Sequence, residues 1–273
     1  MPRVSVVLSS KNGAAYIERA IESVLSQSFT DFEFIIINDG STDNTLSLIK
    51  EFADKDRRVV CLDNGRNIGI QKSVNGGLRI AKGEYIARID DDDFWIDSEK
   101  LAKQIDFLDR NKDYVVVGTG VVMFNEEGKE LFRFAEKEND SELRKRILKK
   151  DPFTNSSVLI RKSAILKVGL YREDRDALHV EDYDMFLMLG RIGKFKTLQE
   201  YMTGFTMRKG GISGSNKLSQ FRKGLSLLKR YRRDYPGGTT AFICVLIKII
   251  GYFGYRIIPE SLKMKAFSIY KRT

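Results

Sequence analysis

Short apolar runs alternate with amphipathic helical patterns near the start of the chain, and this alternation constrains the fold more than any other feature. Val4–Leu8 and Phe34–Ile37 resemble buried parallel strands. Between them, apolar residues at i, i+3, i+4, i+7 and i+8 from Ile17 predict an amphipathic helix. Further strands are predicted at Val59–Leu62 and Tyr85–Ile89, with a helix capped by Ser41 and another over 70–81. The pattern predicts an α/β fold in which helices flank a mostly parallel sheet.

The rest of the pattern up to residue 215 predicts a second half of the same domain. Asp97 is expected to cap a helix that includes Leu101, Ile105 and Leu108. Strands are predicted at Tyr114–Phe124, Glu130–Phe134 and Ser157–Ile160, and helices near 141–150, 163–168 and 181–189. We therefore predict one domain over 1–215, with halves at 1–110 and 111–215, and a C-terminal extension over 216–273.

Four consecutive aspartates, Asp90–Asp93, follow the strand predicted at Tyr85–Ile89. Like charges this close repel one another, which leaves three interpretations: a solvated acidic turn, a helix N-terminus, or a site for a divalent cation. Ligands of open α/β sheets bind beyond the carboxyl ends of the strands. Asp39 also follows a predicted strand, so it should lie at the same edge. This location favours the cation site.

Each of the four aspartates has a predicted role. Side chains two residues apart on a strand share a face, so Asp90 and Asp92 can act from one side. Mg²⁺ and Mn²⁺ prefer hard oxygen ligands of this kind and often keep only one or two protein carboxylates beside substrate phosphates. We expect Asp91 to point the other way and Asp93 to support the turn into Phe94.

The positive charge of the chain is concentrated at its C-terminal end. The net charge is +10, but residues 217–273 alone hold 13 Lys or Arg and 2 Asp or Glu. This leaves the body near neutrality, which argues against a nucleic-acid surface and for an anionic partner of the tail. The apolar run Ala241–Tyr255 contains Lys248 and is too short to span a bilayer. We expect the tail to lie on an anionic membrane surface as basic amphipathic helices, the alternative being that it packs on the body.

The two cysteines, Cys61 and Cys244, are far apart and have no metal-binding spacing, which suggests a reducing compartment. The first apolar run is too short for a signal peptide. Together with the basic tail, these features predict a cytoplasmic protein bound peripherally to the membrane.

Several ordered motifs resemble those of inverting glycosyltransferases of family 2, which have the GT-A fold. Val4–Asn12 is similar to the first strand and donor loop of the family, and Ile35–Thr42 is similar to the segment with its uridine-contacting aspartate. The stretch from Asn67 to Asp90 matches a long signature that ends in the D-x-D motif. His179–Asp184 is similar to the E-D-Y-D box. The resemblance covers roughly residues 3–213, and its strength lies in the order and spacing of the motifs.

The resemblance implies a donor, a metal and a base. A nucleotide sugar, most plausibly a UDP-sugar, would bind a divalent ion (Mn²⁺ or Mg²⁺) held chiefly by Asp92, with Asp90 beside it. Asp182 would be the general base, with Glu181 orienting the site. The implied donor-binding residues are Ser9, Asn12, Asp39, Asn67, Ser73, Asp90, Asp91 and Arg208. The acceptor would be a hydroxyl of a surface or lipid-linked glycan, approached by Asn155–Ser157.

The sequence also departs from the family. Arg208 stands where many members have a metal-binding histidine, and a guanidinium cannot coordinate a cation. It can instead pair with a diphosphate. Ser9-Ser-Lys11 replaces a common Pro-Thr-Tyr, and Met188 replaces a frequent arginine.

Two other functions stay open: a sugar-phosphate nucleotidyltransferase, and a non-catalytic nucleotide-sugar-binding partner. A nucleotidyltransferase typically has a Gly-rich loop with basic residues near the first strand, where this chain offers only Lys11. His179 is predicted to be a loop residue, and Asp184 and Asp43 to be structural. For Trp95, stacking on a sugar and packing in the core are equally compatible with the sequence.

Overall fold

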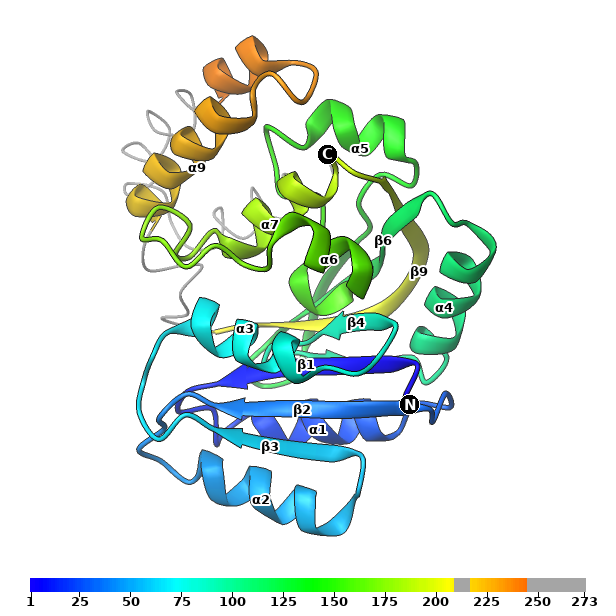
Figure 1. Ribbon diagram of the computed structural model, residues 1–273, viewed down its shortest axis with the longest axis vertical. Coiled ribbons are helices and arrows are strands. Elements are labelled where there is room, and N and C mark those ends of the chain that lie inside the picture. The colour runs from blue at the N-terminus through cyan, green and yellow to red at the C-terminus, as the bar shows by residue number, and fades with distance from the viewer. Residues whose placement is uncertain (209–216, 245–273) are drawn as a thin grey trace.

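The structure, a computed structural model, describes residues 1–208 and 217–244 (Figure 1). In the second of these ranges, side chains are described from residue 222 onward. Its strands form one nine-stranded sheet in the order β3-β2-β1-β4-β8-β6-β9-β5, with β7 beside β6. The strands are β1 Val4–Ser10, β2 Phe32–Asn38, β3 Val59–Asp63, β4 Tyr85–Arg88, β5 Phe94–Trp95, β6 Tyr114–Asn125, β7 Glu130–Phe134, β8 Leu159–Arg161 and β9 Lys194–Met207. The first four neighbours are parallel, and so are β6 and β9.

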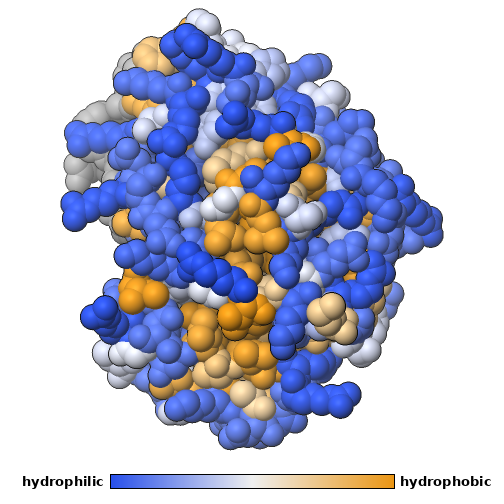
Figure 2. All heavy atoms as spheres, in the orientation of Figure 1, coloured by the Kyte–Doolittle hydropathy of each residue, from blue (hydrophilic) through white to orange (hydrophobic). Residues whose placement is uncertain are grey.

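Helices cover both faces of the sheet, as the alternating pattern predicted (Figure 1). They are α1 Ile17–Leu25, α2 Thr45–Lys55, α3 Ile70–Ile80, α4 Lys100–Arg110, α5 Asp140–Arg146, α6 Lys162–Val168, α7 Glu181–Leu189 and α9 Lys217–Tyr231. A short 3₁₀ turn, η1, spans Asn155–Ser157. Adjacent strand residues enter opposite cores: Val6 and Leu8 pack with α1 and α4, whereas Val7 packs with α3 and α7. On the face seen in Figure 2, apolar residues run down the middle between hydrophilic margins.

Two predicted helix caps are wrong. Helix α2 begins at Thr45 after Asn44, and the Ser41 hydroxyl instead accepts a hydrogen bond from the Asn12 N–H, at 3.0 Å. Helix α4 begins at Lys100, and Asp97 belongs to the preceding turn, where its carboxylate accepts the Glu99 N–H at 2.8 Å. In both cases the polar side chain organises the loop before the helix.

Strands β5 and β9 have no counterpart in the sequence-based expectations. Residues 194–207 mix lysines, threonines and apolar residues without clear alternation, yet β9 is a long strand that pairs with β6. Its far end also pairs with β5, where Phe94 lies opposite Gly204. This pairing brings the end of β9 to the acidic run, which positions the site.

The C-terminal helix α9 packs against the body. Leu227, Leu228 and Tyr231 are buried in the same core cluster as α7. The Tyr231 hydroxyl donates to Asp184 Oδ1 at 2.8 Å, and the Tyr235 hydroxyl donates to the Leu187 carbonyl at 2.6 Å. The described part of the extension therefore shares a core with the domain, while the apolar run beyond Cys244 lies outside the described residues.

Within the ranges that the structure describes, none of the helices has the length and apolar character needed to cross a membrane. The exposed side of the segment after Leu228 carries basic residues. These are Lys229, Arg230, Arg232 and Arg233.

Candidate functional site

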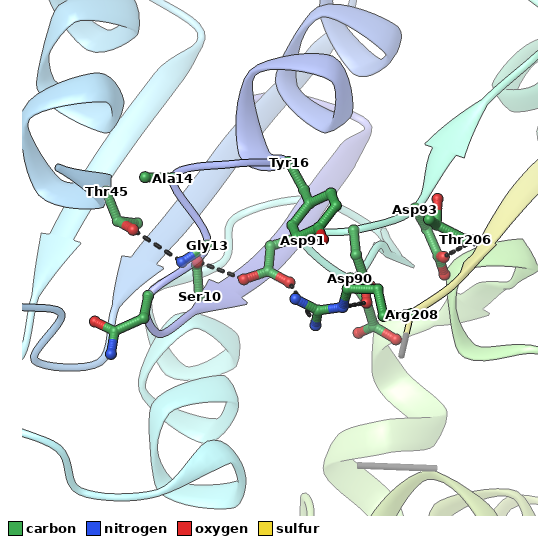
Figure 3. A network of polar contacts seen from close by, with 12 residues as sticks. Ser10, Gly13, Ala14, Tyr16, Thr45, Asp90, Asp91, Asp93, Thr206 and Arg208 are labelled. Carbon is green, nitrogen blue, oxygen red and sulfur yellow. Dashed lines mark hydrogen bonds and ion pairs between the residues drawn. The ribbon is translucent and has the colours of Figure 1, made fainter. Parts of the chain in front are cut away.

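The acidic run lies where the carboxyl ends of β1, β2 and β4 meet, as expected. It is not an extension of β4, which ends at Arg88. The run turns back on itself, and the Asp93 N–H donates to the Asp90 carbonyl at 3.2 Å. Alternation between two faces of a strand therefore does not apply to it. In Figure 3 the side chains of Asp90, Asp91 and Asp93 point in different directions.

Asp90 points toward η1 and a buried arginine. Its Oδ1 accepts a hydrogen bond from Asn155 Nδ2 at 2.9 Å, and its N–H donates to Ser156 Oγ at 3.0 Å. Arg88 NH2 lies 3.7 Å from the same Oδ1. The Asp90 carboxylate thus has one neutral donor, Asn155, and one buried cation beside it.

Asp91 does not point away from Asp92, and that expectation is wrong. Its Oδ2 accepts the Ser10 hydroxyl at 2.5 Å, and its Oδ1 lies 3.9 Å from Arg208 NH2. Asp92 Oδ2 lies 2.6 Å from Arg208 Nε. Because the run is a turn, Asp91 and Asp92 both reach the same guanidinium.

The environment of Asp92 disfavours its charged form. Burial is the largest cause, followed by the negative charge of Asp91, and together they raise the pKa of Asp92 to about 7 although Arg208 opposes them. Burial also raises the pKa of Asp91, and the negative charge of Asp90 adds to it, while the Ser10 hydroxyl and Arg208 oppose them. This part of the site therefore attracts positive charge.

The carboxylates of Asp90, Asp91 and Asp92 offer the hard oxygen ligands that Mg²⁺ and Mn²⁺ prefer. Among the residues that the structure describes, however, no group of three or more Asp, Glu, His or Cys is arranged to hold a metal ion. This finding is compatible with an ion that takes one or two carboxylates and completes its shell from substrate oxygens, and Asp92 with Asp90 is the pair that the family resemblance implies. The metal requirement itself stays a prediction.

Asp93 supports the turn, as predicted. Its carboxyl accepts the Ser156 hydroxyl at 2.5 Å and the Thr206 N–H at 3.1 Å. The side chain is buried, and burial raises its pKa well above the ordinary value. Asp93 thus joins η1 to the end of β9.

Trp95 also contacts η1, because its Nε1 donates a hydrogen bond to the Ser156 carbonyl at 2.9 Å. Trp95 is 4% exposed, so it packs in the core instead of offering a face to a sugar.

Asp39 organises the loop that follows β3. Its Oδ1 accepts hydrogen bonds from Asn64 Nδ2 at 3.1 Å and the Ile68 N–H at 2.8 Å, and its Oδ2 accepts the Gly69 N–H at 3.0 Å. A side chain on Gly40, which has a φ of +66°, would collide with the backbone of Asn67. The aspartate predicted to contact uridine is therefore also the anchor of the neighbouring loop.

The other predicted donor-binding residues surround this anchor. The Asn12 carboxamide oxygen accepts the Thr42 N–H at 2.8 Å, and Ser9 is a half-buried residue of β1. Exposed Asn67 accepts the Gly69 N–H at 3.1 Å. Ser73 is fully buried and accepts a hydrogen bond from Asn64 Nδ2 at 2.8 Å. Asn12 and Asn67 are thus accessible, whereas Ser73 supports the loop.

Asp182 and Glu181 lie in the first turn of α7 and are partly buried. Burial raises the pKa of Asp182 well above its usual range, and the charges of Glu181 and Asp90 raise it further. Burial likewise raises the pKa of Glu181, whose Oε2 is buried without a hydrogen-bond partner in the described structure. The two α7 carboxylates and Asp90 are therefore close enough to influence one another.

Arg88 connects the two acidic groups and was missed by the sequence reasoning. It is 2% exposed, and its NH1 donates to the Val7 carbonyl at 2.8 Å. Its positive charge acts on both Asp90 and Asp182, and lowers the pKa of Asp182 against the other causes. A charged residue inside the apolar run Tyr85–Ile89 was the signal that could have identified it.

The residues predicted to be structural are so. Asp184 is 1% exposed and accepts hydrogen bonds from Arg172 Nε at 2.6 Å and from Tyr231. Asp43 Oδ2 accepts the Ala14 N–H at 3.2 Å, which fixes the loop after β1. His179 precedes α7 in a loop, with a φ of 67°.

The sequence model described as glycosyl transferase family 2 matches residues 5–174. The Bacillus subtilis (strain 168) protein EpsE, named as a glycosyltransferase, is 35% identical over 187 residues, which cover 68% of this chain and 66% of EpsE, just under two thirds of its length.

Solved structures share the fold. Residues 1–349 of Staphylococcus aureus TarS, in complex with UDP-GlcNAc, superpose with a TM-score of 0.66 at 21% identity, over 84% of this chain and 66% of that one. The mannosyltransferase PcManGT of Pyrobaculum calidifontis, in complex with GDP-Man and Mn²⁺, gives a TM-score of 0.64 at 15% identity, over 98% of this chain and 80% of that one. At these identities the likeness concerns the fold, which is GT-A.

Proposed function

Because the chain belongs to glycosyl transferase family 2, we propose that it moves a sugar from a nucleoside-diphosphate sugar, most plausibly a UDP-sugar, to an acceptor hydroxyl with inversion at the anomeric carbon. One observation carries the proposal. The acidic run after β4 and the carboxylates of α7 act on the same buried Arg88. The shared arginine supports a site in which a cation-attracting group acts beside a proton acceptor.

The donor would occupy the edge formed by the loops after β1, β2 and β3. Asn12 and Asn67 are accessible there, and Asp39 fixes the surrounding backbone. Binding of UDP-GlcNAc by the structural neighbour TarS supports a UDP-sugar. The diphosphate would lie beside Arg208, whose guanidinium carries the opposite charge, and would face Asp92 across a divalent ion.

A divalent ion, when bound by Asp92 with Asp90, would neutralise charge on the departing diphosphate. The Mn²⁺ in the structural neighbour PcManGT supports this part of the proposal. Asp91 and Ser10 would keep the turn in place beneath it.

Asp182 is the proposed general base. In a single displacement, the acceptor oxygen bonds to the anomeric carbon while the bond from that carbon to the diphosphate oxygen breaks. The hydroxyl proton passes to the Asp182 carboxylate, and the electron pair of the broken bond leaves with the nucleoside diphosphate. A raised pKa suits a base because it strengthens proton affinity near neutral pH. Glu181 would orient the acceptor.

The acceptor is proposed to be a surface or lipid-linked glycan at an anionic membrane surface, with the protein peripheral on the cytoplasmic face. The exposed Lys229, Arg230, Arg232 and Arg233 support this location. Replacing all four with glutamine should weaken binding to anionic vesicles without removing buried side chains. Unchanged binding to phosphatidylglycerol vesicles would contradict the membrane proposal.

The function is tested by incubating the full chain with a panel of nucleotide sugars and lipid-linked saccharides, with Mn²⁺ or with a chelator, and measuring released nucleoside diphosphate. We expect release with at least one UDP-sugar, and a product of inverted anomeric configuration by NMR. Release of pyrophosphate from a nucleoside triphosphate and a sugar phosphate would identify a nucleotidyltransferase instead. Donor binding without turnover across the panel would favour the non-catalytic alternative.

A further inference from the structure

Arg208 lies directly on the acidic run. Its Nε is 2.6 Å from Asp92 Oδ2 and its NH2 is 3.9 Å from Asp91 Oδ1. The guanidinium carbon lies 4.9 Å from the centre of the Tyr16 ring, so an aromatic face supports the cation from another side. Figure 3 shows the arginine reaching from the end of β9 between Tyr16 and the aspartates.

The backbone fixes this contact. Phe94, two residues after Asp92, pairs with Gly204 of β9. The Thr206 N–H donates to Asp93 Oδ1 at 3.1 Å, and Arg19 NH2 donates to Thr206 Oγ1 at 2.7 Å. Arg208 thus begins only two residues beyond an anchored position. Its contact with Asp92 follows from the register of β9 on β5.

Asp90 and Asp91, the neighbouring carboxylates, each have a nearer partner than Arg208. Asp90 is held by Asn155 and Arg88, and Asp91 by the Ser10 hydroxyl. In Asp92, by contrast, the carboxylate oxygen Oδ2 already has the Arg208 guanidinium as its cation. A guanidinium cannot coordinate a metal, so it and a divalent ion compete for that carboxylate.

We propose that Arg208 is a displaceable internal counterion of Asp92. Without donor it pairs with Asp92 and weakens metal binding there. When the diphosphate and the ion arrive together, the ion takes the carboxylate and the displaced guanidinium pairs with the diphosphate. Metal and nucleotide therefore bind cooperatively, and each strengthens the other by the same factor because the coupling is reciprocal. This inference rests on the proposed function for the identity of its diphosphate.

The experiment measures Mn²⁺ binding to the full chain without any sugar, from the electron paramagnetic resonance signal of free Mn²⁺. We expect Arg208→Met to bind Mn²⁺ about tenfold more tightly than wild type in the absence of nucleotide, a coupling of ordinary size. Adding UDP should tighten Mn²⁺ binding in wild type, and should do so less in Arg208→Met. Equal or weaker Mn²⁺ binding by Arg208→Met would overturn the proposal.

Two further variants make the result specific. Arg133→Met removes an exposed arginine that pairs with Glu130 on β7, so it should leave Mn²⁺ binding unchanged. Adding Asp92→Asn to Arg208→Met should remove the gained affinity, and gain that survives would place the ion elsewhere and refute the competition. Arg208→Lys keeps a charge with little change in volume, so it should bind Mn²⁺ with intermediate affinity even if the Met variant folds poorly. Because no transfer is measured, failure here is separate from failure of the proposed function.

Discussion

The two acidic groups of the site differ in how their charge is balanced. In the run after β4, Asp92 meets Arg208, which comes from the far end of β9. At the start of α7, the described cation whose charge acts on Glu181 and Asp182 is the buried Arg88, which also lies 3.7 Å from Asp90. Asp92 therefore contacts an arginine directly, whereas the two α7 carboxylates share the influence of Arg88 with Asp90.

This difference suggests a division of labour. A carboxylate that faces a long, partly exposed arginine can exchange that partner for an incoming cation. A carboxylate that burial and neighbouring negative charges hold at a raised pKa is better suited to accept a proton. The comparison predicts that equivalent substitutions in the two groups will have different effects.

The largest expected effect follows Asp182→Asn. Loss of a general base lowers the rate of transfer about 10²–10⁴-fold, while the donor affinity should stay near that of wild type, because Asp182 belongs to the α7 group. Initial rates and UDP titrations measure the two quantities. Asp176→Asn, the same change at an exposed position nearby, is the matched control. A variant that binds donor and transfers as fast as wild type would exclude Asp182 as the base.

The neighbours Asp92 and Asp93 should separate function from stability. Asp93→Ala leaves the buried Thr206 N–H without its acceptor, so we expect the free energy of unfolding to fall by about 1–3 kcal/mol. Asp92→Ala removes a partly exposed ion pair and should change stability much less, but weaken binding of donor with metal. Urea unfolding of both variants checks this. Equal loss of stability would remove the distinction between the two residues.

The sequence predicted the first strands of the sheet and its flanking helices, and it suggested the candidate residues, because these signals are local. Apolar runs, helical periodicity and short motifs each lie within a few residues of the feature they determine. The placement of Asp93 as a support was also predictable, since it adjoins the turn into Phe94.

The failures depend on contacts between distant segments. The predicted direction of the Asp91 side chain was wrong because β4 ends at Arg88. The alternation of side chains along a strand therefore does not extend to the acidic run. Strand β9 lacks clear alternation, and its pairing with β5 joins positions more than 100 residues apart. The ion pair of Arg208 depends on that pairing. Long-range register of this kind cannot be read from residue types.

The pH dependence of transfer tests the raised pKa of Asp182. A base must be deprotonated, so the rate should fall as the pH drops through its pKa, and this limb should lie above the ordinary range for aspartate because burial and then Glu181 raise that pKa. Glu181→Gln removes the second cause and should move the limb to lower pH. The profile of kcat against pH measures both. A limb that stays in place in Glu181→Gln would mean that the two carboxylates do not interact.

The smallest effect is expected at the support of α7. Tyr231→Phe removes one hydrogen bond to Asp184 while keeping the ring in the core, so we expect the free energy of unfolding to fall by about 1 kcal/mol. Arg172 still pairs with Asp184, which limits the loss. Since α7 carries the proposed base and not the cation-attracting run, the variant should alter the rate of transfer more than Mn²⁺ binding with UDP. The opposite result would mean that α9 supports the site through the acidic run, and the two groups would not be mechanically separate.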